Sequence, residues 1–298
     1  MSILVTTPTG NVGSRVAARL IEENVEFSVF ARTPETLPPA VQSHATVHQG
    51  DLEAVDTLKA ALDGIDSMFL VIPPNMQTDD WRGWQQQIAT NAAQAAEATD
   101  VDRIVFLSSA GAQYKDIGPV TGLGEAEHIL ERAVPRVVAL RAGYFMENFL
   151  QFAGSIAAEH TIYHAFPADK EWPMVATQDI GDAAVDELLR DAHSGHRIQG
   201  VHGPTDLSHA EAASIIGEVI GLPVEYVAVP MEALKEQMRA MDLSANVIDN
   251  YAAMINGLIR LSRDDIEPRT PDSTTPTTLA SFTETVLQPA IDAAATAS

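Results

Sequence analysis

Short apolar runs alternate with longer amphipathic patterns through the first 140 residues of this 298-residue chain. The apolar runs predict strands at Ile3–Thr6, Glu26–Ala31, Thr46–Gln49, Ser67–Ile72, Arg103–Leu107 and Arg136–Leu140. The longer patterns predict helices at Asn11–Glu23, Val55–Leu62, Trp81–Ala98 and Gly122–Arg132. Strands that alternate with helices favour a parallel sheet covered on both faces, in which ligands bind beyond the carboxyl ends of the strands. We therefore expect an α/β fold with a doubly wound parallel sheet and a site at its strand ends.

The pattern loosens after Leu150, where short strands and helices mix. We expect helices at Thr177–Arg190, Ser208–Ile220, Met231–Met241, Ser244–Leu258 and Leu279–Ala293, with strands at Arg197–His202 and Glu225–Val229. Ser208 and Glu211 stand three residues apart before an apolar periodic run, which is the signature of a capping box. These features predict a sheet domain over residues 1–150 and a smaller α/β lobe over residues 151–298, interleaved with the first.

The composition excludes several kinds of site and partner. The chain has no cysteine, so disulfides, thiolate nucleophiles and cysteine-ligated metal sites are excluded. Its 18 Lys and Arg residues against 41 Asp and Glu residues give a formal net charge of −23. Nucleic acids and anionic membranes bind through clustered Lys and Arg, so neither is an expected partner. No apolar run reaches the roughly 18 residues of a membrane span and no basic segment precedes the first strand, so we expect a cytoplasmic protein.

The most informative segment is the turn after the first expected strand. It reads Thr9-Gly10-Asn11-Val12-Gly13 and leads into an amphipathic helix. Gly10 would let the backbone approach a pyrophosphate, and Gly13 would let the helix pack closely on the strand. The N-terminus of the helix would offer N–H groups to the phosphates. A plain strand-to-helix turn is the alternative that these residues alone leave open.

This turn resembles the Thr-Gly-x-x-Gly turn of the NmrA-like family of atypical short-chain dehydrogenases, which bind NAD(P) on a Rossmann fold. A second block, Arg141-Ala-Gly-Tyr-Phe-Met-Glu-Asn148, is similar to the family's Arg-Pro-Gly-x-Phe-Met-Glu-Asn. The resemblance implies that residues 1–150 bind the dinucleotide and that the C-terminal lobe covers a substrate cleft. The chain departs from the family at Thr7, where the family has glycine. A β-branched residue followed by Pro8 is expected to keep ordinary φ values.

Arg32 follows the second expected strand, where NAD enzymes of this architecture carry an acidic residue. Its guanidinium would instead pair with a 2′-phosphate, so this residue favours NADP(H) over NAD(H) as the cofactor. A solvent-facing Arg at a strand end is the alternative. The resemblance further implies that Asp51 and Leu52, which follow the third strand, flank the adenine.

The ends of the next three strands also match the family. The resemblance assigns to the cofactor site Ile72 and Pro73 after the fourth strand, Ser108 after the fifth, and Gly143, Tyr144 and Phe145 after the sixth. It places Ser109 near the substrate carbonyl. All these residues end strands, so a parallel sheet would bring them to one edge.

The proton donor of typical short-chain dehydrogenases is missing from the sequence. Those enzymes use Tyr-x-x-x-Lys, whereas Tyr114 has no lysine four residues later, and Leu123 replaces a lysine that many family members carry. A simple ketone needs such a donor, but a quinone, a cationic dye or a conjugated iminium disperses or cancels the charge that hydride transfer creates. We therefore expect an NADPH-dependent reductase of an apolar conjugated small molecule, with Ser109, Tyr144 or His128 as assisting groups.

Two alternative functions stay open at this point. The protein can be a non-catalytic NADP(H) sensor that acts through a protein partner, or a scaffold in which Thr7 has abolished cofactor binding. The sequence is compatible with a monomer and with a homodimer.

Two pairs of histidines have the spacing of metal ligands. His160 and His164 stand four apart, and His193 and His196 stand three apart. No carboxylate joins either pair at ligand spacing. We therefore expect solvated histidines and no metal.

Overall fold

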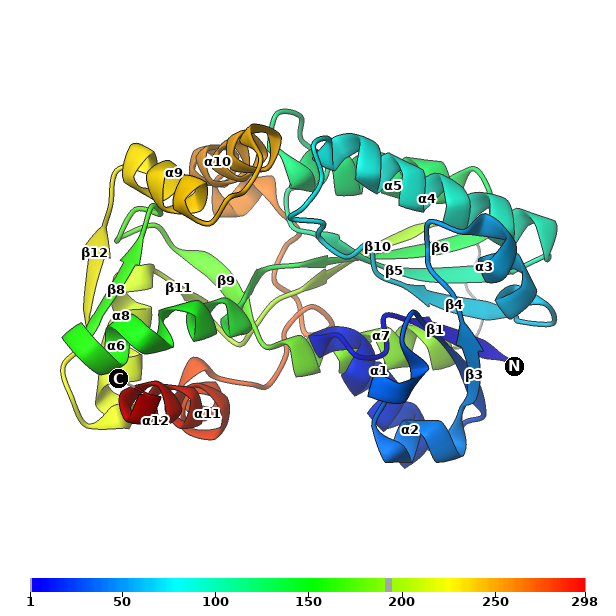
Figure 1. Ribbon diagram of the computed structural model, residues 1–298, viewed down its shortest axis with the longest axis horizontal. Coiled ribbons are helices and arrows are strands. Elements are labelled where there is room, and N and C mark those ends of the chain that lie inside the picture. The colour runs from blue at the N-terminus through cyan, green and yellow to red at the C-terminus, as the bar shows by residue number, and fades with distance from the viewer. Residues whose placement is uncertain (1, 191–194, 298) are drawn as a thin grey trace.

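The computed structural model describes residues 2–190 and 195–297, and its core is a seven-stranded parallel sheet (Figure 1). The sheet contains β1 (Ile3–Thr6), β2 (Phe27–Ala31), β3 (Thr46–Gln49), β4 (Ser67–Leu70), β5 (Arg103–Ser109), β6 (Arg136–Ala142) and β10 (Arg197–Val201). Their order is β10-β6-β5-β4-β1-β2-β3, and each pairing is parallel. The expected α/β fold of the Rossmann type is confirmed, and its strand order reverses between β1 and β4.

Helices cover both faces of this sheet. In Figure 1, α1 (Asn11–Glu22), α2 (Pro39–His44) and α7 (Thr177–Leu189) lie on one face, and α3 (Val55–Leu62), α4 (Trp81–Ala98) and α5 (Pro119–Glu131) lie on the other. Within β1, Ile3 and Val5 are buried in the first layer, while Leu4 is buried in the second. Because neighbouring strand residues point to opposite faces, a strand covered on both sides is apolar throughout. This explains the uninterrupted apolar runs in the sequence.

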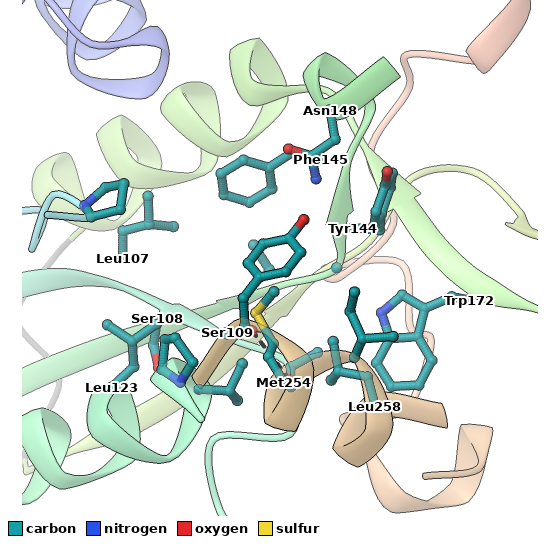
Figure 2. A pocket seen from close by; sticks show the side chains of 18 of the residues that line it. Leu107, Ser108, Ser109, Leu123, Tyr144, Phe145, Asn148, Trp172, Met254 and Leu258 are labelled. Carbon is teal, nitrogen blue, oxygen red and sulfur yellow. Dashed lines mark hydrogen bonds between the residues drawn. The ribbon is translucent and has the colours of Figure 1, made fainter. Parts of the chain in front are cut away.

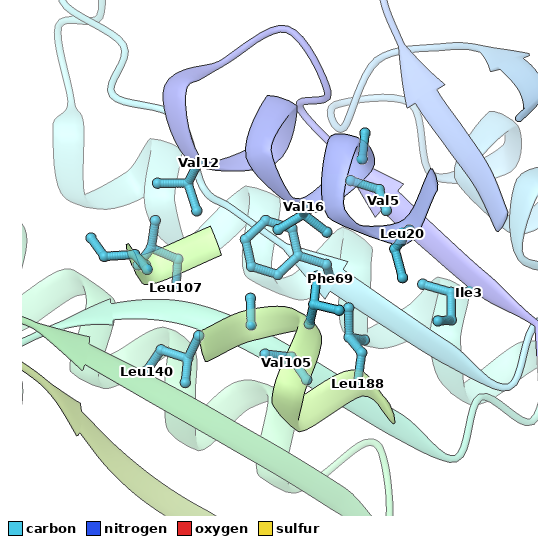
Figure 3. Packing of buried hydrophobic residues seen from close by; sticks show 14 of the residues in the cluster. Ile3, Val5, Val12, Val16, Leu20, Phe69, Val105, Leu107, Leu140 and Leu188 are labelled. Carbon is cyan, nitrogen blue, oxygen red and sulfur yellow. The ribbon is translucent and has the colours of Figure 1, made fainter. Parts of the chain in front are cut away.

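The strand and helix that position the first turn are anchored by this packing. Figure 3 shows Val16 and Leu20 of α1 in one buried cluster with Phe69 of β4 and Leu188 of α7. Complete burial of an apolar side chain of this kind stabilises a fold by about 1.5–3 kcal/mol. Replacement of Leu20 by alanine would leave a cavity and cost about 2–5 kcal/mol. The position of α1 over the sheet is therefore set by its buried face.

The later part of the chain forms a smaller lobe at one end of the sheet (Figure 1). Its helices are α6 (Ala153–Glu159), α8 (His209–Ile220), α9 (Met231–Ala240), α10 (Ala245–Arg260), α11 (Leu279–Phe282) and α12 (Gln288–Ala297). Its strands are β7 (Tyr144–Phe145), β8 (Thr161–His164), β9 (Trp172–Val175), β11 (Asp206–Leu207) and β12 (Glu225–Ala228), which pair as β11-β9-β7 and β12-β8. The capping box of α8 is confirmed, because Ser208 Oγ accepts from the Glu211 N–H at 3.2 Å and the Glu211 carboxylate accepts from the Ser208 N–H at 2.8 Å.

Two elements after residue 150 return to the large sheet. β10 pairs with β6 and forms one edge of the sheet. α7 packs beside α1, where Arg15 contacts Asp182 at 2.7 Å and Arg19 contacts Asp186 at 2.6 Å. The chain thus crosses between the sheet and the lobe more than once, and residue 150 is not the last residue that contributes to the sheet.

The helix expected over Leu279–Ala293 is interrupted in the structure. α11 ends at Phe282, and a π-helical turn over Thr283–Leu287 precedes α12. The buried Thr283 hydroxyl donates to the Leu279 carbonyl at 2.7 Å. In a regular α-helix this carbonyl accepts from the backbone N–H four residues later, so the hydroxyl competes with that hydrogen bond. A hydroxyl inside a helix can open its hydrogen-bond pattern in this way.

The described residues contain no helix that is both long enough and apolar enough to cross a bilayer. α4 is the 18-residue helix of the sheet layer, and it carries Arg82 and Glu97. Its buried residues, such as Ile88, pack against the sheet.

Candidate functional site

A groove at the carboxyl edge of the sheet begins at the turn between β1 and α1. The Thr7 carbonyl accepts a hydrogen bond from the Gly10 N–H at 3.0 Å, and a Cβ on Gly13 would lie 2.2 Å from the same oxygen. Gly13 is therefore required for the close approach of α1. Within the described chain no side chain caps the start of α1, and its first turn holds no acidic residue. Free N–H groups with positive partial charge at a helix N-terminus suit a phosphate.

Thr7 adopts a φ of +49°, so the expectation of an ordinary φ at this position is wrong. A left-handed backbone at a non-glycine residue costs about 1–2 kcal/mol. The conformation is imposed by its surroundings, because the Thr7 carbonyl lies against both Gly10 and Gly13. On the other side, the buried Thr6 hydroxyl fixes the end of β1 by donating to the Phe69 carbonyl at 3.0 Å. The backbone of Thr7 therefore adopts a conformation that is usual for glycine.

The groove has a volume of about 270 Å³ and continues past the ends of β2 and β3. Arg32 lines it with a side chain that is 77% exposed, and Arg32 Nε lies 3.9 Å from Asp51 Oδ2. This loose ion pair leaves most of the guanidinium donors available. A glycine turn, an uncapped helix and an exposed Arg form the donor set that a pyrophosphate and a phosphorylated ribose require, so the residues fit a dinucleotide.

A mostly apolar cavity of about 330 Å³ lies beyond the ends of β5 and β6. Figure 2 shows Leu107, Ser108 and Leu123 on one side of it, with Tyr144 and Trp172 on the opposite side. None of its described lining residues is Asp, Glu, Lys or Arg. Such a cavity can enclose an apolar, uncharged molecule at little desolvation cost.

The groove and the cavity meet at the segment that follows β4. Pro73 lines the groove, whereas Ile72 and Pro74 line the cavity. The Trp84 indole N–H donates to the Pro73 carbonyl at 3.0 Å and holds this segment against α4. A ligand in the groove can therefore reach the cavity across one short segment.

The structure divides the predicted site residues between these two places. The groove holds Thr9, Gly10, Arg32, Asp51, Leu52 and Pro73. The cavity holds Ile72, Ser108, Ser109, Gly143, Tyr144 and Phe145. Asn11, Val12 and Gly13 are the first residues of α1 and line neither place. His128 also lies outside both, because its side chain is 70% exposed on α5 and contacts Glu131 at 3.1 Å. Its position gives no support to the assisting role that the sequence predicts.

Ser108 is held by a buried ionic network behind the cavity. Its hydroxyl donates to Glu127 Oε1, and Arg141 Nη2 donates to Glu127 Oε2 at 2.7 Å. Arg141 also contacts Glu267 at 2.7 Å. Because Glu127 and Arg141 are buried and paired, their charges compensate each other, and the network ties β5, α5 and β6 to the C-terminal segment.

The Tyr and Lys pair of typical short-chain dehydrogenases has no counterpart among the described cavity residues. The Tyr114 hydroxyl donates to Asp265 Oδ1 at 3.1 Å instead. Lys115 is exposed, and the Lys170 ammonium donates to the Leu261 carbonyl. Leu123, which replaces the family's lysine, contributes an apolar side chain to the cavity wall.

Two cavity histidines are the residues that sequence reasoning missed. His164 ends β8 and His209 begins α8, and both line the cavity with side chains that are buried. The prediction that His164 is solvated is wrong. A signal was present in Thr161–His164, because in a strand His164 shares its buried face with Ile162 while Tyr163 faces solvent. For His209 only the neighbouring capping box indicates a fixed position.

The other histidines of the two predicted metal-ligand pairs give no sign of a metal site within the described residues. His160 and His196 are exposed, and His193 lies outside the described residues. Among the residues that the structure describes, no group of three or more His, Cys, Asp or Glu could hold a metal ion.

Comparison with known proteins agrees with this geometry. The sequence matches the model of the NmrA-like family over residues 1–275. It is 30% identical over 250 residues to an NAD(P)H azoreductase from Xenophilus azovorans, a match that covers 83% of this chain and 84% of that protein. The structure of an NADPH-dependent quinone oxidoreductase from Escherichia coli with NADPH has a TM-score of 0.76 at 19% identity, over 95% of this chain and 98% of that one. A triphenylmethane reductase from Citrobacter sp. has a TM-score of 0.76 at 18% identity, over 99% and 100% of the two chains. As its motifs predicted, the chain belongs to the NmrA-like family.

Proposed function

We propose that this protein uses NADPH to reduce an apolar conjugated small molecule of the quinone, dye or iminium type. At the coarser level the chain is an NAD(P)H-dependent oxidoreductase, in line with its azoreductase relative and with the quinone oxidoreductase of the same fold. The observation that carries the finer proposal is the cavity of about 330 Å³, without a charged side chain among its described lining residues, that meets the dinucleotide groove at Ile72–Pro74.

The groove would hold the cofactor mainly through its backbone. A reduced nicotinamide, when bound, supplies a hydride. The N–H groups that follow Gly10 would bind the pyrophosphate. Arg32 would bind a 2′-phosphate, because a short charge-assisted bond to phosphate is stronger than its 3.9 Å contact with Asp51. These features support a preference for NADPH over NADH.

The cavity favours an acceptor that needs no acid from the protein at the moment of hydride transfer. The hydroxyls of Ser108 and Ser109 donate to Glu127 and to the Ala110 carbonyl. Burial raises the pKa of the Tyr144 hydroxyl well above its usual 10, so it can donate a hydrogen bond but releases its proton poorly. A simple ketone would leave an unprotonated alkoxide here, whereas a quinone or a dye spreads the charge until water protonates it.

The activities of related proteins support this acceptor class. One relative is an azoreductase, and two proteins of the same fold reduce quinones and triphenylmethane dyes. Azo, quinone and triphenylmethane compounds are all extended conjugated systems. The shared chemistry is addition of a hydride to a delocalised acceptor rather than to an isolated carbonyl.

Turnover with a matched panel tests the proposal. The protein is mixed with NADPH or NADH and with 1,4-naphthoquinone, an azo dye, a triphenylmethane dye or cyclohexanone, and loss of the reduced nicotinamide is followed by absorbance. We expect NADPH to be consumed faster than NADH with at least one conjugated acceptor, and cyclohexanone to be inert. Binding of NADPH without consumption by any acceptor would overturn the proposal and favour the NADP(H) sensor instead.

A further inference from the structure

Three polar aromatic side chains gather at one side of the apolar cavity. Tyr144 lies in β7, His164 ends β8 and His209 begins α8, so three separate elements contribute. The ring of His209 lies 5.2 Å from that of Tyr144 and 5.5 Å from that of His164, between centroids. His209 is 0% exposed and His164 is 5% exposed. The three rings therefore form one cluster, and all three line the cavity.

The polar atoms of this cluster lack partners within the protein. Tyr144 Oη, His164 Nδ1 and both ring nitrogens of His209 are buried without a hydrogen bond to any described residue. The Asn148 side chain is near enough to Tyr144 to oppose part of the effect of burial on its pKa, but it makes no hydrogen bond of normal geometry. An unsatisfied buried polar group is destabilising, because it has lost its hydrogen bonds to water without gaining others. Several such atoms at one place indicate a site that a polar ligand group completes.

A neighbouring tyrosine that does not line the cavity has its hydroxyl hydrogen-bonded within the protein. The Tyr226 ring lies 5.2 Å from His209, but its hydroxyl donates to the Phe166 carbonyl at 2.6 Å. Tyr226 does not line the cavity. Within this ring cluster, the atoms without a partner among the described residues therefore belong to residues that face the cavity.

Both histidines are uncharged near neutral pH. Burial lowers the pKa of His164 to about 4, and burial together with the nearby His164 lowers the pKa of His209 to about 3. A neutral imidazole carries one N–H donor and one bare nitrogen acceptor. The cluster can therefore both donate to and accept from a ligand, but it offers no positive charge to compensate an anion.

We propose that Tyr144, His164 and His209 form a subsite for an uncharged hydrogen-bonding group, a carbonyl or an aromatic hydroxyl, carried by the acceptor. This inference deepens the proposed function and rests on it for the identity of the ligand as the acceptor. Figure 2 shows Tyr144 across the cavity from Ser108, so the subsite and the strand ends beside the dinucleotide groove would hold opposite ends of one molecule. The subsite would select conjugated acceptors with a second polar group and reject carboxylates.

Binding of redox-inert ligands tests the subsite without any turnover. Trp81 and Trp172 line the cavity, so quenching of their fluorescence reports occupancy in protein without dinucleotide. The probes are 2-naphthol, 2-methylnaphthalene and 2-naphthoate, which share a ring system and differ in one substituent. We expect the wild type to bind 2-naphthol at least about tenfold more tightly than either of the others, the value of one net hydrogen bond.

Two variants and one matched control test whether the preference for 2-naphthol depends on the polar atoms of the cluster. His209→Phe and Tyr144→Phe keep an aromatic ring and remove polar atoms, and each should reduce the naphthol preference about tenfold while leaving the affinity for 2-methylnaphthalene within about twofold. Tyr226→Phe removes a hydroxyl from the same ring cluster that does not line the cavity, and it should leave the preference unchanged. Thermal melting confirms that each variant is folded.

The outcomes separate this inference from the proposed function. Equal wild-type affinity for 2-naphthol and 2-methylnaphthalene, or a preference that survives in both His209→Phe and Tyr144→Phe, would overturn the subsite. Neither result depends on NADPH or on a reduction. A protein that consumes NADPH with naphthoquinone but shows no naphthol preference would keep its function and lose the subsite, whereas the reverse result would keep the subsite and remove the reductase.

Discussion

The groove and the cavity lie at the same edge of the sheet but recognise their ligands by different means. The groove starts at one contiguous strand, turn and helix, and it offers backbone N–H groups with one exposed cation, Arg32. The cavity is assembled from side chains between residues 71 and 258, and its described lining is uncharged. The comparison teaches that a phosphate site can be encoded in a few adjacent residues, whereas a cavity for an acceptor depends on how distant segments pack.

Gly13→Ala should break the groove and spare the cavity. The new Cβ would lie 2.2 Å from the Thr7 oxygen, so the turn must open. We expect NADPH affinity to fall at least about 100-fold, or roughly 3 kcal/mol, with 2-naphthol affinity unchanged, both measured by isothermal titration calorimetry. Gly154→Ala is the control, because a Cβ there meets nothing within 4 Å. Wild-type NADPH affinity in Gly13→Ala would show that the turn does not hold the cofactor.

Arg32→Glu should separate the two cofactors within the groove. Loss of a charge-assisted pair with the 2′-phosphate should weaken NADPH binding by about 1–3 kcal/mol, while NADH affinity stays nearly constant. Arg132→Glu makes the same change in net charge at an exposed residue at the C-terminal end of α5 and so controls for the electrostatic field of a chain with a net charge of −23. An Arg32→Glu protein that binds both cofactors like the wild type would mean that this side chain points away from the ligand.

Acid should destabilise the cavity through its histidines. Unfolded histidines take up a proton near pH 6.5, whereas His164 and His209, with pKa values lowered by burial to about 4 and about 3, stay neutral in the fold. The unfolded state then binds more protons, so stability falls as the pH drops below about 6.5, by roughly 2 kcal/mol for each histidine between about pH 7.5 and about pH 5. Urea unfolding should show that His209→Phe loses about 2 kcal/mol less than the wild type over this interval. Equal losses would mean that His209 is protonated in the native state.

Thr7→Gly should have the smallest effect of these changes, and it tests whether the positive φ of Thr7 strains the turn. The φ of +49° is strained at threonine and free at glycine, although glycine loses more backbone entropy on folding. We expect a net gain of about 0.5–1 kcal/mol in unfolding free energy and slightly tighter NADPH binding. Destabilisation together with weaker binding would show that the loop is adapted to the Thr7 side chain.

The contrast between the groove and the cavity also explains which features could be predicted from the sequence. The glycine turn and the apolar strands depend on neighbours in the chain, so the fold and the start of the groove followed from local pattern, whereas Asp51, Leu52 and Pro73 followed from the resemblance to the family. The positive φ of Thr7 did not, because it is imposed by the close approach of α1. His209 was missed because its burial depends on how α8 packs beside Tyr144, for which local spacing carries no signal. His164 was missed because no strand was predicted at Thr161–His164, although the alternation in this segment places His164 on the buried face.

A single-turnover experiment shows whether the protein transfers hydride to a conjugated acceptor. Protein in molar excess over NADPH is mixed anaerobically with NADPH and with either 1,4-naphthoquinone or 1-tetralone, which share a bicyclic frame. The same reaction with Gly13→Ala provides the background rate. We expect the wild type to transfer the hydride to the quinone well above the rate of Gly13→Ala, while NADPH persists with the tetralone. NADPH that remains bound and unoxidised with the quinone, or equal reduction of the tetralone, would contradict this expectation.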